Sequence, residues 1–168
     1  MKYVGAGALS CAAVLAAVFA NLRRRRRVTL LRRLSEFFAA FASFSELAPR
    51  DAARTVRRLA ESESFGSLGF LMPFSRRCAD ANVRQVWREE TASFSGGAVL
   101  TSEQRRLLSD FAEQFGLTSL ERFTAACRNY ESRFAAEAEK EKQALEKTET
   151  LTAGAGVLGA ALILIVCW

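Results

Sequence analysis

The sequence predicts an all-α protein, an antiparallel helical bundle that lies between two transmembrane helices. Three observations lead to this prediction. An uncharged, mainly apolar run occupies each end of the chain, apolar residues between the runs recur at steps of three and four, and no segment sustains the apolar-polar alternation of a strand. We expect a first transmembrane helix in residues 1–22, a cytoplasmic helical-bundle domain in 23–150 and a second transmembrane helix in 151–168.

The first uncharged run extends over residues 3–22, and its twenty residues are enough to cross about 30 Å of hydrocarbon. A cleaved secretion signal is the alternative, because residues 8–11 resemble a lipoprotein cleavage site. The run continues well beyond Cys11, however, and five arginines follow it directly, so we expect an uncleaved anchor. These arginines are Arg23, Arg24, Arg25, Arg26 and Arg27.

The same arginines predict the orientation of the chain, because basic residues next to a span stay in the cytoplasm. Only Lys2 precedes the first run, so both termini are expected outside and the middle domain inside. Without Lys2 and residues 23–27, the chain has 18 basic and 18 acidic residues. The net charge of +6 therefore belongs to the membrane boundary. We interpret the arginines as a topology signal that also touches the lipid bilayer, and we expect no nucleic-acid partner.

Helical spacing continues after the arginines. A Phe-rich stripe predicts that the first helix extends to about Leu47, and that a partner covers this face. The stripe consists of Leu30, Leu31, Leu34, Phe37, Phe38, Phe41 and Phe44. Pro49 and Asp51 suit the first turn of a second helix, and a third is expected from the apolar residues near 70 to about Ala81.

Two cap signals predict the next helices. Asn82 is expected to cap a fourth helix, in which Trp87 is a core residue or, alternatively, an exposed aromatic at a partner surface. Residues 101–104 have the spacing of a capping box, and Gly116 is expected to close the helix that they open. Residues 118–121 repeat this box at the start of the last helix.

The last helix begins with a narrow packing seam and then becomes polar. The seam consists of Leu120, Phe123, Cys127, Tyr130 and Phe134. The Ala-, Glu- and Lys-rich residues beyond it predict a rigid stalk that leads into the second uncharged run, residues 151–168. Gly154, Gly156 and Gly159 in this run have the spacing of a dinucleotide-binding loop, but no strand precedes them. We interpret them as contacts between transmembrane helices.

The residues provide no constellation for catalysis. The chain has no histidine, which excludes Ser-His-Asp and Cys-His systems, and its four cysteines lack the spacing of a zinc site. Glu89 and Glu90 could supply paired carboxylates, but adjacent residues point about 100° apart on a helix, so a solvated face is the preferred interpretation. We therefore predict no catalytic residue, cofactor or metal, and expect that the chain is not an enzyme.

Taken in order, these features resemble the stage III sporulation protein AB family of endospore-forming bacteria. The resemblance covers nearly the whole chain and is clearest in residues 100–116, in the charged helix over 137–147 and in the span over 154–166. Two positions depart from the family pattern. Residues 43–45 are Ser-Phe-Ser where the family tends to have an acidic pair, and Phe123 replaces a frequent glutamine.

The resemblance implies a location in the outer forespore membrane, with the domain in the mother cell. It also implies a non-enzymatic platform, similar to those of type II secretion and type IV pilus machines. The implied partners are the secretion-type ATPase of the same operon, stage III sporulation protein AA, and other membrane proteins of that operon; a homo-oligomer is left open. The alternative is a membrane-anchored adaptor or receptor unrelated to transport. An integral membrane enzyme is disfavoured, because the spans contain no ionisable residue.

Overall fold

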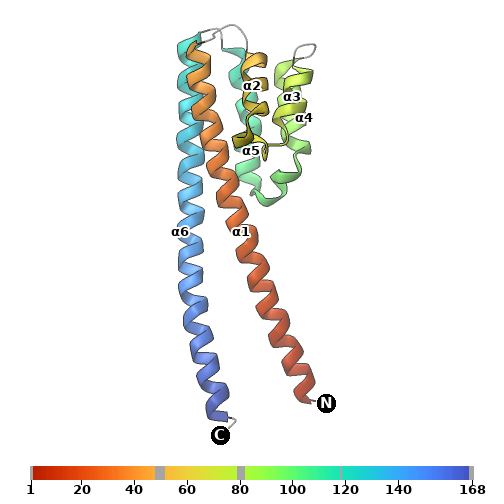
Figure 1. Ribbon diagram of the computed structural model, residues 1–168, viewed down its shortest axis with the longest axis vertical. Helices are drawn as coiled ribbons and strands as arrows, with labels where there is room; N and C mark the ends of the chain where they lie inside the picture. Colours follow the sequence, from red (N-terminus) through yellow and green to blue (C-terminus); the bar gives the residue numbers. More distant parts are fainter. Residues whose placement is uncertain (1, 48–51, 79–81, 118, 167–168) are drawn as a thin grey trace.

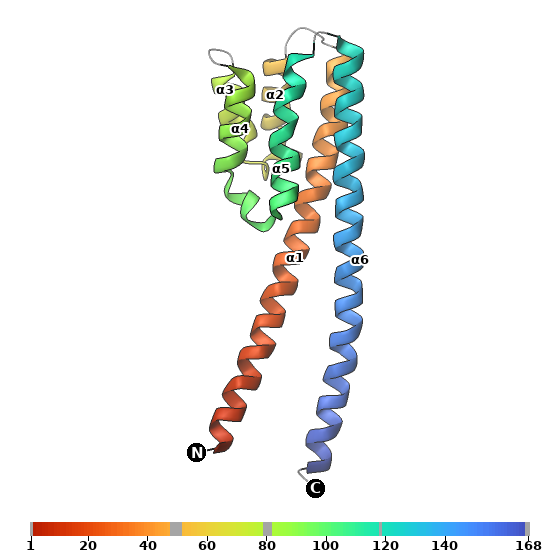
Figure 2. The same ribbon diagram turned by 180° about the vertical axis from the view of Figure 1, so that it is seen from behind.

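The structure is a computed structural model of residues 1–168, and its fold is dominated by two long helices. It describes the backbone of residues 2–47, 52–78, 82–117 and 119–166, and the side chains of 18–45, 55–78, 82–117 and 119–147. Helices α1 (Lys2–Leu47) and α6 (Leu120–Val166) run antiparallel, packed against each other beside the short helices and diverging toward their outer ends, so that both termini lie at the same end of the molecule (Figures 1 and 2). No strand occurs among these residues, and the predicted all-α class is confirmed.

Four short helices lie beside α1, at the end of the hairpin away from the termini (Figure 1). They are α2 (Ala52–Glu61), α3 (Leu71–Arg77), α4 (Val83–Ser93) and α5 (Ser102–Asp110). The first of them packs directly against α1, and the other three pack in chain order on one another. Three 3₁₀ segments connect or extend them, namely η1 (Glu63–Phe65), η2 (Ser95–Val99) and η3 (Phe111–Gly116). We call α2 to α5, η1 to η3 and the parts of α1 and α6 that they cover the helical domain.

The predicted stripe of α1 forms the centre of the core. Phe38 stacks on Phe134 of α6, with ring centroids 5.4 Å apart, and meets Phe111 edge-on at 4.7 Å. Phe37 faces the short helices and stacks on Trp87 at 6.4 Å. The prediction is wrong at Phe44, which is 39% exposed. The last turns of α1 instead bury the side that carries Ala42 and Ser45, which leaves Phe44 outside the core.

Trp87 lies at the centre of the helical domain, as one of the two interpretations predicts. It is 0% exposed, and the rings of Phe70 and Phe74 meet it edge-on at 5.3 and 5.1 Å. Its indole N–H donates to the carbonyl oxygen of Leu108 at 2.8 Å. This carbonyl belongs to the last turn of α5, where α-helical partners run out, so the indole satisfies it. The alternative of an exposed aromatic surface is wrong.

The two predicted caps within the described residues are confirmed. The Asn82 side chain accepts a hydrogen bond from the Arg84 amide at 3.1 Å. At the start of α5 the Thr101 hydroxyl accepts from the Gln104 amide at 3.2 Å, while the Gln104 side chain accepts from the Thr101 amide at 3.1 Å. The chain then tightens into η3, which ends at Gly116. The expectations for Pro49, Asp51, residues 79–81 and Thr118 lie outside the described residues.

Helix α6 continues without a break from the seam into the polar stalk, as predicted. Cys127 and Phe134 are fully buried, and Ala138 extends the seam by one more turn. Residues 139–147 are exposed or half-buried. A single helix thus connects the core of the helical domain to the second uncharged run.

Candidate functional site

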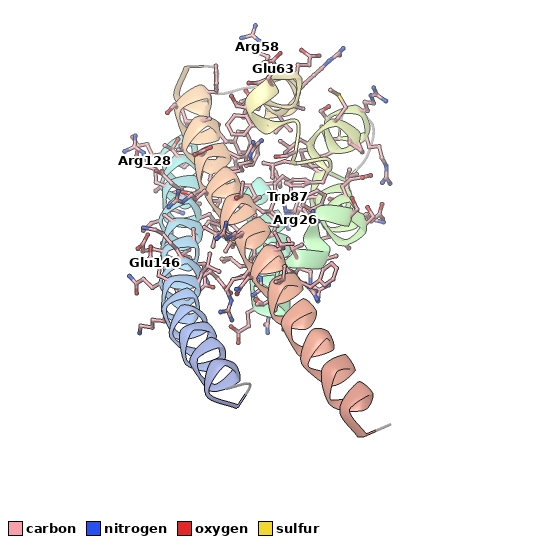
Figure 3. The ribbon with its side chains drawn as sticks, turned by 60° about the horizontal axis from the view of Figure 1, so that its bottom comes forward. Arg26, Arg58, Glu63, Trp87, Arg128 and Glu146 are labelled. Atoms are coloured by element: carbon pink, nitrogen blue, oxygen red, sulfur yellow. The ribbon has the colours of Figure 1, made fainter. Side chains whose placement is uncertain are left out.

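The arginine segment, residues 23–27, lies where α1 leaves the helical domain (Figure 3). Arg23 donates to the carbonyl oxygen of Ala98 at 2.8 Å, and Arg27 donates to that of Val99 at 2.5 Å. Both carbonyls stand at the end of η2, where a helix leaves carbonyl groups unpaired and carries partial negative charge. Two of the five arginines therefore hold η2 against α1.

The same segment also joins α1 to α6 through Glu141. Its carboxylate accepts from Arg27 at 2.9 Å and lies 3.7 Å from the Nε of Arg24. The Nη1 of Arg24 donates to the Ala144 carbonyl at 3.4 Å. The Glu141 side chain is only 14% exposed, so this contact is better shielded from water than a surface ion pair. Arg27 thus contacts α6 and η2 at once.

These contacts add a structural role that the sequence analysis missed. The sequence places the arginines beside an apolar run, and this position predicted a topology signal. Glu141 is one of several acids in a charged helix, and backbone carbonyls have no signature in a sequence. The contact between Arg27 and Glu141 could have been found from the register of α1 and α6. Pairing the Phe-containing stripes of the two helices fixes this register.

Parts of the two predicted spans lie outside the described side chains. The backbone of Gly154, Gly156 and Gly159 is helical within α6, but their predicted packing contacts fall among residues whose side chains are not described. The same holds for residues 3–17 of α1. No helix in the described part of the chain combines enough length with enough apolar character to cross a membrane.

Glu89 and Glu90 form ion pairs at the surface of α4, where the Glu89 side chain is 43% and the Glu90 side chain 12% exposed. Both carboxylates accept hydrogen bonds from Arg77, at 2.6 and 2.5 Å, and Glu89 also accepts from Gln85 at 2.8 Å. The hydrogen bonds from Gln85 and Arg77 lower the pKa of Glu89 and so favour its charged form. A general acid needs the opposite shift. Among the described residues, no group of three or more metal-binding side chains lies together.

The two cysteines with described side chains are buried. Burial raises the pKa of Cys127 to about 12, because a thiolate would be poorly solvated among apolar residues. A reactive cysteine requires a lowered pKa. Cys78 donates weakly to the Ser75 carbonyl at 3.5 Å. Both side chains therefore act as small apolar fillers, while the side chains of Cys11 and Cys167 lie outside the described residues.

The departures from the family pattern have local explanations. Ser43 and Ser45 donate to carbonyl groups one turn back in α1, at 3.1 and 2.7 Å. Phe123 is half-buried and packs edge-on against Phe41, with centroids 5.4 Å apart. At these positions the chain stabilises its own helix or core.

The fold and the arginine contacts together define a class of protein: an all-helical domain built on a long helical hairpin, with both ends of the hairpin leaving it on one side. A family model described as stage III sporulation protein AB (spore_III_AB) matches residues 2–168. The chain belongs to this family and is a sporulation protein, which confirms the resemblance. No curated protein and no solved structure matches the chain.

Proposed function

We propose that this protein is a non-enzymatic membrane platform in a secretion-like complex that endospore development needs. Its uncharged runs, residues 3–22 and 151–168, are the two membrane spans, and its helical domain is cytoplasmic. In a sporulating cell it belongs to the outer forespore membrane, with the helical domain in the mother cell. There it anchors a cytoplasmic secretion-type ATPase, the stage III sporulation protein AA, beside other membrane proteins of the operon.

The continuity of α1 and α6 is the observation that supports this proposal. Each helix extends from the packed core into one of the uncharged runs, and the two runs leave the helical domain at the same end (Figure 2). At about 1.5 Å per residue, each helix is about 70 Å long, which exceeds the thickness of a membrane. A force on the helical domain is therefore transmitted along stiff helices to the spans.

A break in the α6 stalk tests this mechanism. Gln143 is exposed and lies between the helical domain and the second run. Gln143→Pro removes a backbone hydrogen-bond donor and kinks the helix, whereas Gln143→Ala keeps the donor and leaves the helix straight. We expect the proline variant to reach the membrane and bind the ATPase but to block sporulation, and the alanine variant to sporulate normally. Normal sporulation of the proline variant would refute rigid coupling.

Co-purification tests the platform role against the adaptor alternative. The full chain, solubilised from sporulating cells, is expected to retain a secretion-type ATPase. If no such ATPase associates with it and deletion leaves spore formation intact, the platform role is wrong.

Cysteine labelling tests the topology. In a chain whose own cysteines are replaced, Ser132→Cys places a thiol on an exposed position of α6, and Lys2→Cys places one before the first run. In the plasma membrane of growing cells, an impermeant maleimide should label position 2 and spare position 132. Labelling of position 132 in intact cells would contradict the proposed orientation.

A further inference from the structure

A groove of about 590 Å³ lies between α1 and the edge of the helical domain that carries η2. One wall is a single face of α1 that contains Leu22, Arg25, Arg26 and Arg33, and the opposite wall includes Ser95 and Gly96 at the start of η2. Because Arg23 and Arg27 hold η2 against α1, the width of the groove is set by protein contacts.

The charge of this groove is positive. Three arginines are among the described residues that line it, and no acidic residue is. Arg33 is oriented by hydrogen bonds to the Ser64 carbonyl at 3.1 Å and the Ser67 hydroxyl at 2.9 Å. Arg26 is exposed, at the point where α1 leaves the helical domain (Figure 3). Such a site favours an anion, because guanidinium groups form charge-assisted hydrogen bonds to phosphate oxygens.

The groove continues into an apolar surface toward the chain ends. Phe19, Leu22 and Arg26 follow one another at steps of three and four, so they share a face of α1. Phe19 is 68% and Leu22 is 47% exposed, so both side chains are open to contact with an apolar ligand on this face. A ligand that fits both parts carries a negative charge at one end and a hydrocarbon chain at the other.

We infer that this groove binds one anionic phospholipid, with the headgroup phosphate between Arg26 and Arg33 and an acyl chain along Leu22 and Phe19. This inference rests on the proposed function, because it places residues 3–22 in the bilayer. It divides the five arginines: Arg23, Arg24 and Arg27 hold the helices and η2 together, whereas Arg25 and Arg26 line the groove and face lipid.

The test uses the full chain, solubilised in mild detergent with phosphatidylglycerol or phosphatidylcholine, and native mass spectrometry to count retained lipids. We expect the wild type to retain one phosphatidylglycerol in preference to phosphatidylcholine. Arg26→Gln should weaken this binding about fivefold, and Arg25→Gln/Arg26→Gln about 25-fold. Arg32→Gln is the matched control, since Arg32 is exposed on the same helix but lines a different pocket, between α1 and α6, and it should bind like the wild type.

Equal retention of the two lipids by the wild type, or equal losses in Arg26→Gln and Arg32→Gln, would overturn the inference. Membrane insertion is measured separately, by extraction of vesicles with alkaline carbonate. Release of the wild type by carbonate would refute the proposed spans, while lipid retention in detergent still decides whether the groove is a headgroup site.

Discussion

Replacement of Trp87 by phenylalanine should destabilise the helical domain by about 2–4 kcal/mol. The indole is fully buried, and its N–H donates a hydrogen bond to the Leu108 carbonyl at the end of α5. Phenylalanine fills most of the same space but cannot donate. The substitution therefore combines a small cavity with a buried carbonyl that has lost its partner.

The magnitude follows from these two losses. Removal of about 40 Å³ at about 24 cal/mol per Å³ costs about 1 kcal/mol. A buried carbonyl without a hydrogen bond costs about 1–3 kcal/mol more. Phe74→Leu is the matched control, because Phe74 is equally buried against Trp87 but its loss removes no polar contact. That variant should cost about 1 kcal/mol.

Hydrogen exchange of the backbone amides in α4 and α5 measures the stability of both variants in the full chain, because it reports the free energy of opening for each segment. Trp87→Phe should lower this free energy by clearly more than Phe74→Leu, and the largest effect should lie in the last turn of α5. Equal effects of the two variants would show that the indole hydrogen bond contributes no net stability, and would refute the reasoning.

Three further predictions concern other contacts. Thr101→Ala removes half of the capping box and should destabilise the start of α5 by about 1 kcal/mol, measured by hydrogen exchange of its first turn. Glu141→Gln should loosen the contact with Arg27 and speed exchange of the nearby α6 amides, whereas Glu139→Gln, which alters an exposed side chain, should not. The Cys127 thiol should resist alkylation at pH 8 unless the chain is unfolded. Because its pKa of about 12 in the folded state exceeds the usual 9.0, the free energy of unfolding should decline as the pH rises from about 9 toward 12.

The local features of this fold could be predicted because they depend on residues close in sequence. The Asn82 cap and the Thr101 capping box each involve groups at most three residues apart, and the structure contains both. The stripe of α1 follows from helical periodicity alone. Phe44 is the exception, because its exposure depends on which elements cover the last turns of α1, and periodicity does not specify them.

The contacts of the arginine segment could not be predicted for the same physical reason. Arg27 and Glu141 are 114 positions apart, and Arg27 and the Val99 carbonyl are 72 apart. Such contacts exist only once α1, α6 and η2 are packed in one register. A sequence shows the positive charges but not which of them meet a carbonyl or a carboxylate. The charge pattern therefore indicated contact with lipid for all five arginines of residues 23–27.

The position of these contacts has a mechanical consequence. Arg27 joins α1 to Glu141 on α6 and to Val99 at the end of η2, just where the two long helices leave the helical domain. A shift of α6 along α1 must therefore break the Glu141 contact or move η2 with it. Since η2 also forms a wall of the proposed lipid groove, movement of the helices would change the groove as well. In a platform that works against an ATPase, this arrangement would couple displacement of the helical domain to its binding of lipid in the groove.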